Sequence, residues 1–167
     1  MSVEPSPPAI TSVPWAQAPL ANASASGACA QGADVIAGGL GSTDMLYYAS
    51  GSLSVPGAMI TASHNPSKYN GIKLCRAGAK PVGADTGLAE LRAMAEQELP
   101  PGQGPAGAVT GQDLLAGYSS YLKSLVDLSG IRPLKVAVDA GNGMAGHTVP
   151  HVFQGLPVTL ILSLIHI

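Results

Sequence analysis

The feature that most constrains the fold of this chain is a polar loop between two short apolar runs, within residues 57–76. The first run, residues 58–62, ends at Ser-His-Asn-Pro, and the second run covers residues 72–75. Short apolar runs bounded by turn residues are typical of buried strands, so the stretch predicts a strand, an exposed loop and a second strand. Because ligands bind at the carboxyl ends of strands in open α/β sheets, this loop is the first candidate for a functional site.

Positive charge gathers around the same loop. The chain has eight Lys and Arg residues and a formal net charge of −2, and none of the eight precedes Lys68. Four of them lie within thirteen positions of one another: Lys68, Lys73, Arg76 and Lys80. A local cluster of cations in a slightly acidic chain predicts an anionic substrate, because the cluster concentrates anions at the site.

The loop carries a recognisable motif. Thr-Ala-Ser-His-Asn-Pro at residues 61–66, followed by Tyr-Asn-Gly-Ile-Lys at residues 69–73, closely resembles the active-site serine loop of the α-D-phosphohexomutases, the phosphomannomutases and phosphoglucomutases. The resemblance runs from about Gly32 to about Gly146. It implies an isomerase that interconverts hexose 1-phosphate and hexose 6-phosphate through a phosphoserine and a bisphosphate intermediate, with a sugar phosphate as the substrate.

The resemblance also assigns roles by position. Ser63 would carry the phosphoryl group, Lys73 would act as acid or base, and His64 would complete the catalytic set. Phosphoryl transfer depends mainly on positioning and charge neutralisation, which nearby cations and amides can supply. A Ser-x-Asn-Pro run also forms ordinary turns, and a strand-edge lysine is often only solvated, so both simpler interpretations stay open. The expected substrate- or phosphate-binding residues are Asn65, Lys68 and Asn70.

A magnesium ion is the cofactor that the resemblance implies. In the family, an Asp-Gly-Asp loop in the second domain and the serine phosphate hold the ion, so Ser63 would contribute through its phosphate. The 167 residues contain no Asp-Gly-Asp sequence. We therefore expect an incomplete magnesium site and an inactive N-terminal fragment of the enzyme.

Two other function classes deserve comparison. Residues 141–146, Gly-Asn-Gly-Met-Ala-Gly, follow a predicted strand at 134–139 and fit the dinucleotide-binding fingerprint of an NAD-dependent dehydrogenase. That fingerprint also requires an acidic residue about 20 positions later, and no Asp or Glu follows Asp139.

A non-catalytic fragment is the other alternative. His147, His151 and His166 have neither acidic partners nor the spacing of metal ligands, and we interpret them as incidental.

The composition bears on the cellular location of the protein and on its binding partners. The two cysteines, Cys29 and Cys75, have no paired spacing, which argues against a disulfide scaffold and favours a cytoplasmic location. The nearly balanced charge gives no reason to expect nucleic acid. Prolines interrupt the apolar runs near the start, so neither a signal peptide nor a membrane segment is predicted. The oligomeric state is left open by the sequence.

The alternation of predicted strands and helices indicates an α/β fold, and the resemblance refines it to a three-layer α/β/α domain with a mixed sheet. Residues 1–26 contain five prolines and one charged residue, so we expect them to be disordered or frame-shifted. Because the family has its first βα unit there, with an arginine-bearing loop, the sheet would then have an unpaired edge. We assign residues 27–128 to the first domain and residues 129–161 to the start of a second, similar domain, truncated in this chain.

Finer boundaries follow from local signals. Ser42 is a suitable N-cap for a helix at residues 43–50, and Gly51 should end that helix. Residues 100–111, rich in Pro and Gly, predict a flexible joint before a helix at 112–128. Residues 162–167 form an apolar end that resembles a translated sequencing adapter, so we expect an artefactual tail.

Overall fold

The computed structural model describes residues 9–12, 18–63, 65–66, 68–97, 100–141 and 143–164. Contacts divide the chain into two compact units, residues 1–112 and residues 113–167. We had placed the boundary after residue 128, but helix α4 (Leu115–Ser124) contacts the elements of the second unit. Among the described helices, none combines the length and apolar character needed to span a bilayer.

The first unit contains a mixed six-stranded sheet, as predicted, with the strand order β5-β4-β3-β1-β2-β6. The strands β1, β2, β3 and β6 run parallel to one another, and β4 and β5 run antiparallel to them. The sheet therefore presents the carboxyl ends of four strands along one edge. The bounds are Ala9–Ser12 for β1, Val35–Gly39 for β2, Gly57–Ile60 for β3, Ile72–Arg76 for β4, Lys80–Pro81 for β5 and Val109–Gly111 for β6.

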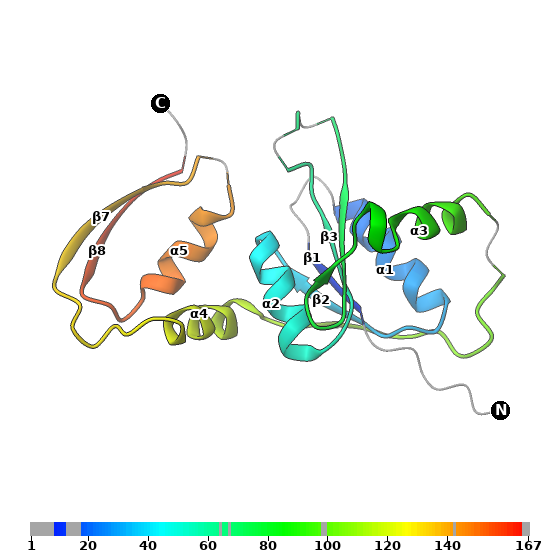
Figure 1. Cartoon of the computed structure of the whole chain (residues 1–167), viewed down its shortest axis with the longest axis horizontal. Coiled ribbons are helices and arrows are strands. Elements are labelled where there is room, and N and C mark those ends of the chain that lie inside the picture. The colour runs from blue at the N-terminus through cyan, green and yellow to red at the C-terminus, as the bar shows by residue number, and fades with distance from the viewer. Residues whose placement is uncertain are drawn as a thin grey trace. The chain divides into compact units, whose positions relative to one another are not determined.

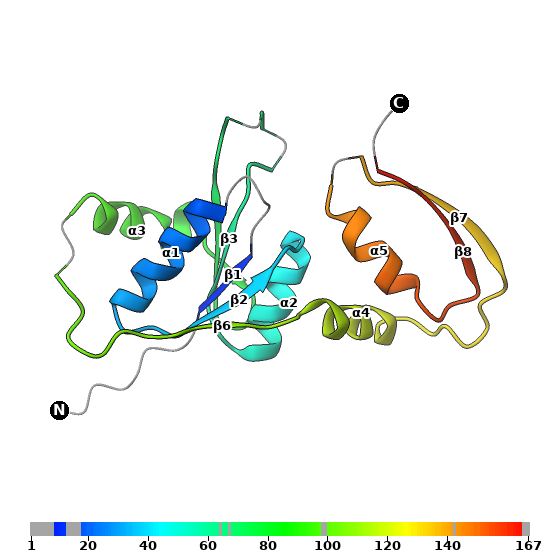
Figure 2. The same ribbon diagram turned by 180° about the vertical axis from the view of Figure 1, so that it is seen from behind.

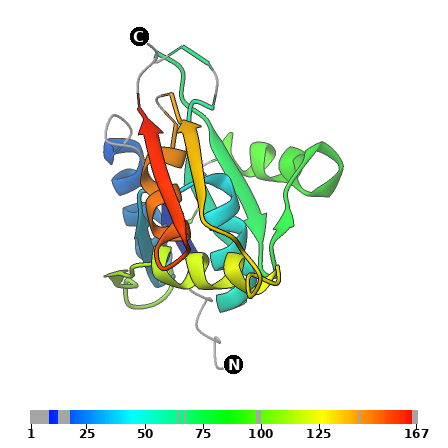
Figure 3. The ribbon, with the colours of Figure 1, turned by 90° about the vertical axis from the view of Figure 1, so that its left-hand side faces the viewer.

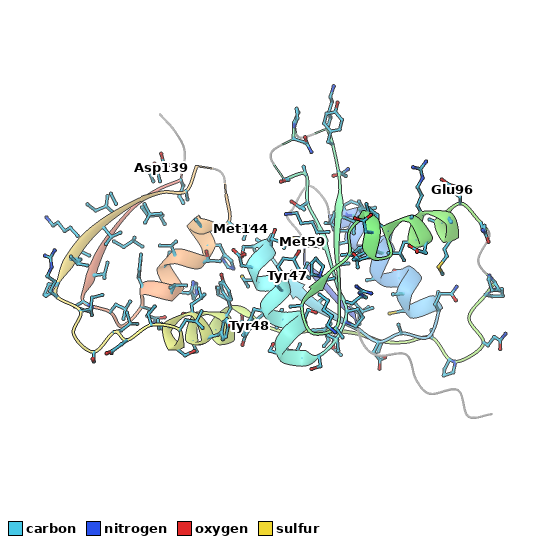
Figure 4. All side chains as sticks on the ribbon, viewed as in Figure 1. Tyr47, Tyr48, Met59, Glu96, Asp139 and Met144 are labelled. Carbon is cyan, nitrogen blue, oxygen red and sulfur yellow. The ribbon has the colours of Figure 1, made fainter. Side chains whose placement is uncertain are left out.

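Helices cover both faces of this sheet. Figures 1 and 2 show α1 (Ala18–Ala30) and α3 (Leu88–Ala95) on one face and α2 (Thr43–Leu53) on the other. The α/β/α layering agrees with the prediction. On the α1 side the core cluster is Ala25, Cys29 and Val35. On the α2 side the cluster is Leu46, Met59 and Cys75, with Tyr47 packed against it (Figure 4).

The first βα unit is present, which corrects our expectation for residues 1–26. Strand β1 pairs with β2 on one side and with β3 on the other, so the sheet has no unpaired edge at this position. Helix α1 begins at Ala18, within the segment that we expected to be disordered. Two local causes explain the helix: alanine has the highest helix propensity, and Pro19 lies in the first turn, where no hydrogen-bond donor is needed.

The predicted flexible joint also differs from the structure. Strand β6, within that joint, is the edge strand beside β2. The Asp34 carboxylate accepts a hydrogen bond from the amide of Ala108 at 2.9 Å, and the amide of Val35 donates to the carbonyl of Ala108 at 2.8 Å. Backbone pairing with a strand more than seventy residues earlier overrides the loop-like composition of this segment.

Helix α2 begins as predicted, and its end differs. The Ser42 hydroxyl accepts a hydrogen bond from the amide of Met45 at 3.3 Å. The helix continues through Gly51 to Leu53, and Ser54 closes it in the left-handed conformation, with φ 55°. A buried hydroxyl supports this end, because the Ser50 Oγ lies 2.7 Å from the carbonyl oxygen of Val55 and 3.0 Å from that of Arg76.

Helix α3 (Leu88–Ala95) starts after a separate turn. A short 3-10 helix, Ala84–Thr86, precedes it, and Gly87 with φ 117° occupies its N-cap position. The Thr86 hydroxyl accepts a hydrogen bond from the amide of Gly83 at 2.7 Å. This local bond orders the residues before α3 as a separate turn.

The second unit is a parallel βαβ arrangement with α4 packed beside it. Strand β7 (Leu134–Asp139) has the predicted bounds, α5 spans Ala145–Phe153, and β8 spans Val158–Ser163. Figure 3 shows β7 and β8 side by side with α5 behind them. Strand β8 includes Leu162 and Ser163, which pair with Val138 and Asp139, so part of the expected artefactual tail belongs to the sheet. Residues 165–167 lie outside the described residues.

Candidate active site

The candidate site lies at the carboxyl-end edge of the parallel strands in the first unit. Strand β2 ends at Gly39 and leads into the start of α2, and β3 ends at Ile60 and leads into the loop 61–71. Figures 1 and 2 show this loop extending beyond the sheet between β3 and β4. Parallel strands bring the segments after β2 and β3 to one edge, where Ser63 and the N-terminus of α2 both lie.

Hydrogen bonds organise the base of the serine loop. The amide of Thr61 donates to the carbonyl of Gly71 at 2.9 Å, which extends the β3–β4 pairing into the loop. A Cβ atom at Gly71 would come within 3.0 Å of the Thr61 carbonyl oxygen, so glycine permits this close approach. The amide of Asn65 donates to the carbonyl of Ala62 at 3.0 Å. The loop therefore leaves the sheet through a closed base and a tight turn.

Ser63 has an unusual backbone conformation. Its φ is 54°, in the left-handed region, and its amide donates to the Thr61 hydroxyl at 3.0 Å. Non-glycine residues in this region cost roughly 1–3 kcal/mol and occur often at functional sites. The side chain is exposed three residues beyond the end of β3. This position places an exposed serine at the edge where ligands of α/β sheets bind.

Lys73 connects β4 to the start of α2. It pairs with Met59 in the sheet, and its ammonium donates to the hydroxyl of Thr43 at 3.2 Å. Thr43 is the first residue of α2, and its hydroxyl also lies 3.7 Å from the Met59 sulfur. The N-terminus of a helix carries a partial positive charge, so the ammonium adds a full charge to an edge that already favours anions.

The four basic residues that are close in sequence do not all lie close together in the structure. Arg76 lies three residues beyond Lys73, about 10 Å along an extended strand, and it faces the opposite side of the sheet because side chains alternate. Arg76 pairs with Lys80 in the β4–β5 ladder, and β4 runs away from the serine loop. Only Lys68 and Lys73 of the four remain at the loop edge, which corrects the predicted four-cation cluster.

The other predicted site residues lie in the exposed loop. Asn65, Lys68 and Asn70 are exposed, and the Lys68 ammonium lies 5.4 Å from the centre of the Tyr69 ring. His64 lies outside the described residues, so the structure gives no geometry for it. The sequence analysis did not name Thr43 as a site residue. Its position could have indicated this, because Thr43 directly follows the N-cap of a helix that comes after a parallel strand.

The described residues do not form a metal site of the kind that the resemblance implies. No group of three or more His, Cys, Asp or Glu side chains in the described part of the chain could hold an ion. Magnesium prefers carboxylate and other oxygen ligands, and the loop edge offers hydroxyls, amides and cations instead. These residues therefore do not fit a magnesium ion on their own.

The glycine turn of the second unit is a strand-to-helix connection. Gly141 has φ 51°, and its amide donates to the Asp139 carboxylate at 2.9 Å. A Cβ atom at Gly146 would come within 2.6 Å of a methyl carbon of Leu164, so this glycine allows α5 to approach the end of β8. Figure 4 labels Asp139 and Met144 at the two ends of the turn. Each of these observations has a structural explanation that requires no nucleotide.

The comparison with known families settles the assignment. A family profile described as phosphoglucomutase/phosphomannomutase, alpha/beta/alpha domain I, matches residues 16–99, about half of the chain. The chain belongs to this family. The match begins before the serine loop and includes all of α1, which starts within the segment that we had interpreted as disordered or frame-shifted.

Curated relatives of this mutase chain extend the similarity into the second unit. A phosphomannomutase from Escherichia coli is 42% identical over an alignment of 139 residues, and the match covers 78% of this chain and 30% of the relative. A phosphomannomutase from Vibrio cholerae is 37% identical over an alignment of 151 residues, and that match covers 88% of this chain and 33% of the relative. The chain thus spans about a third of the length of the curated relatives that it matches.

Solved structures of family members agree with this fold. A phosphoglucomutase/phosphomannomutase family protein from Burkholderia thailandensis superposes with a TM-score of 0.73 at 28% identity, covering 96% of this chain and 36% of that one. A putative phosphomannomutase from Thermus thermophilus gives a TM-score of 0.67 at 26% identity, covering 95% and 37%. The mixed α/β architecture of the mutase chain is therefore that of its family.

Proposed function

We propose that the protein to which this chain belongs is a phosphohexomutase that interconverts hexose 1-phosphate and hexose 6-phosphate. The observation that carries the proposal is the position of Ser63. It combines a left-handed backbone with an exposed side chain at the carboxyl end of β3, in a chain of the mutase family.

In the proposed reaction, phosphorylated Ser63 is the donor. The Oγ–P bond breaks while an O–P bond forms to a hydroxyl of the sugar monophosphate; a base takes the proton of that hydroxyl, and the released Ser63 Oγ takes up a proton. The resulting bisphosphate returns its other phosphoryl group to Ser63, which regenerates the phosphoserine and releases the isomeric product. Each transfer depends on placing the donor and the acceptor in line and on neutralising the phosphoryl charge.

The described residues support two parts of this reaction. The ammonium of Lys73 and the N-terminus of α2 place positive charge at the sheet edge, where a phosphoserine with about −1.5 to −2 charges would be stabilised. Lys73 is also our candidate for moving the proton, and we keep His64 as a candidate beside it. Asn65, Lys68 and Asn70 line the exposed loop and would contact the substrate or its phosphate.

We also propose that the complete enzyme uses Mg²⁺. The Ser63 phosphate would be one ligand. The carboxylates of an Asp-Gly-Asp sequence, which is absent from these 167 residues, would supply the others. Such an ion would neutralise charge on the transferred group. The chemistry derived above for Ser63 and Lys73 involves no step at the metal.

The test is to locate the phosphate in the full-length protein. Peptide mass spectrometry after incubation with a hexose 1,6-bisphosphate should find phosphate on Ser63. The Ser63→Ala variant should lose at least about a thousandfold in kcat, since the covalent route is removed. Ser67, in the same loop, is the matched control, and Ser67→Ala should retain activity. Phosphate found only on other serines, together with an active Ser63→Ala enzyme, would refute the proposal.

A further inference from the structure

Helix α5 carries two histidines outside the candidate active site. His147 and His151 are both exposed, and their ring centres lie 5.9 Å apart with planes inclined by 54°. Residues four apart on a helix lie on one face, one turn above the other. We had interpreted these histidines as incidental because we saw neither acidic partners nor a ligand spacing. The helix corrects the second point, because two histidines four residues apart on one helical face have the spacing of a pair of metal ligands.

A hydrogen bond determines which nitrogen of His151 is available. The Nδ1 of His151 lies 3.1 Å from the backbone carbonyl oxygen of His147. A carbonyl oxygen only accepts, so Nδ1 carries the proton and the Nε2 of the neutral ring keeps its lone pair. Metal-bound histidines usually have this arrangement, in which a backbone carbonyl orients the ring and selects the coordinating nitrogen.

The helix under the pair is anchored within the second unit. The Ser119 hydroxyl of α4 donates to the carbonyl of His151 at 2.9 Å, and the Lys123 ammonium donates to the carbonyl of Gln154 at 2.7 Å. The Thr148 hydroxyl donates to the carbonyl of Met144 at 3.2 Å. The two bonds from α4 thus fix the C-terminal end of α5, including the backbone of His151.

We propose that His147 and His151 form a two-histidine chelating site for a divalent transition-metal ion such as Ni²⁺, Zn²⁺ or Cu²⁺. Imidazole nitrogens suit these ions, and Cu²⁺ binds most tightly in the general order of affinities. With metal–nitrogen bonds of about 2.0–2.1 Å, the two coordinating nitrogens must come within about 3 Å of each other, and histidines four residues apart on one helical face are a known arrangement for this. Water or an external ligand fills the other coordination positions.

This site is separate from the mutase chemistry. Magnesium takes oxygen ligands and keeps much of its water, so two imidazoles do not select it. The inference uses residues of α5 alone and does not depend on the role of Ser63 or Lys73. Its success or failure is therefore independent of the proposed function.

The test is isothermal titration of the 167-residue chain with NiCl₂ at pH 7.5. We expect one Ni²⁺ ion per chain, and His147→Gln and His151→Gln should each weaken binding by about tenfold or more. Binding should also weaken at pH 5.5, because protons compete with the metal for the imidazole nitrogens. His64→Gln and His166→Gln are matched controls that should bind Ni²⁺ as the unaltered chain does.

A second measurement covers the possibility that a variant is misfolded. Ni²⁺ should raise the melting temperature of the unaltered chain and of both control variants, and it should not raise that of His147→Gln or His151→Gln. Titration with MgCl₂ should give no heat that depends on either histidine. The proposal is overturned if the unaltered chain binds no Ni²⁺, or if binding follows His64 or His166 instead.

Discussion

The three left-handed residues other than glycine show how local backbone strain is distributed in the described part of the chain. Ser54 closes α2, and Ala79 lies in the turn between β4 and β5, so both positions reverse the chain. Ser63 instead lies at the end of β3, in the loop that carries the family motif. The strained residue here is the exposed serine that follows β3, at the edge of the sheet where β3 ends.

At this scale we predict that Lys73→Met lowers kcat of the full-length enzyme by about a hundredfold or more, because positioned acid–base groups contribute about 10²–10⁴. Steady-state kinetics with a hexose 1-phosphate measures the change. Lys80→Met is the matched control, since Lys80 lies in β5 beside Arg76 and away from the serine loop. An unchanged kcat in Lys73→Met would show that Lys73 is a solvated surface lysine without a role in proton transfer.

A second residue prediction concerns Thr43, which we expect to position Lys73. Thr43→Val keeps the branched shape and removes the acceptor of the 3.2 Å hydrogen bond, so kcat should fall by about tenfold as the ammonium loses its fixed place. Thr43→Ser should retain most of the activity. In the Lys73→Met background, Thr43→Val should have little further effect, because the two residues act as one unit. Equal losses in both backgrounds would show that Thr43 does not act through Lys73.

Among the elements, the contact between α2 and the β3–β4 hairpin positions the site. Leu46 of α2 is buried against Met59 and Cys75 of the two strands. Gly57 begins β3, and a Cβ atom there would come within 2.7 Å of a methyl carbon of Leu46 and 3.2 Å of the Cys75 sulfur. Glycine thus lets the helix approach the sheet closely, and this approach sets the distance between Thr43 and Lys73.

The corresponding prediction is that Gly57→Ala destabilises the protein by about 1–3 kcal/mol, because overpacking a close contact forces its neighbours to move. Gly51→Ala is the matched control in α2. Its Cβ atom would meet only Ala79, at 3.8 Å, and alanine is favoured over glycine in a helix by about 0.5–1 kcal/mol. Chemical denaturation should give opposite signs for the two substitutions. Equal stability of the two variants would contradict the close packing at Gly57.

At the scale of the whole molecule, the chain contains the donor loop of the proposed mutase and little of the remaining machinery. It spans about a third of the curated relatives that it matches. The described residues offer no cluster of three or more metal-binding side chains. A phosphoryl transfer needs the donor, the acceptor hydroxyl and the neutralising charges to be held at the same time.

We therefore predict that the 167-residue chain has no mutase activity by itself, even with magnesium and a bisphosphate activator. A coupled assay with glucose 1-phosphate and with mannose 1-phosphate measures it, and the full-length enzyme is the positive control. Turnover by the chain that disappears in Ser63→Ala would show that the donor loop and its sheet suffice for catalysis.

Local patterns in the sequence were enough to predict the serine loop, the two strands beside it, the Ser42 cap and the bounds of β7. These features depend on neighbouring residues, namely turn formers, capping hydroxyls and short apolar runs. The tertiary structure decided the rest. Strand β1 and edge strand β6 exist because their backbones pair with β2 across long stretches of sequence, and composition does not encode such pairing. The same pairing separates Arg76 and Lys80 from the serine loop and leaves Lys73 bonded to Thr43, because the direction of a strand, and not proximity in sequence, determines which charges meet.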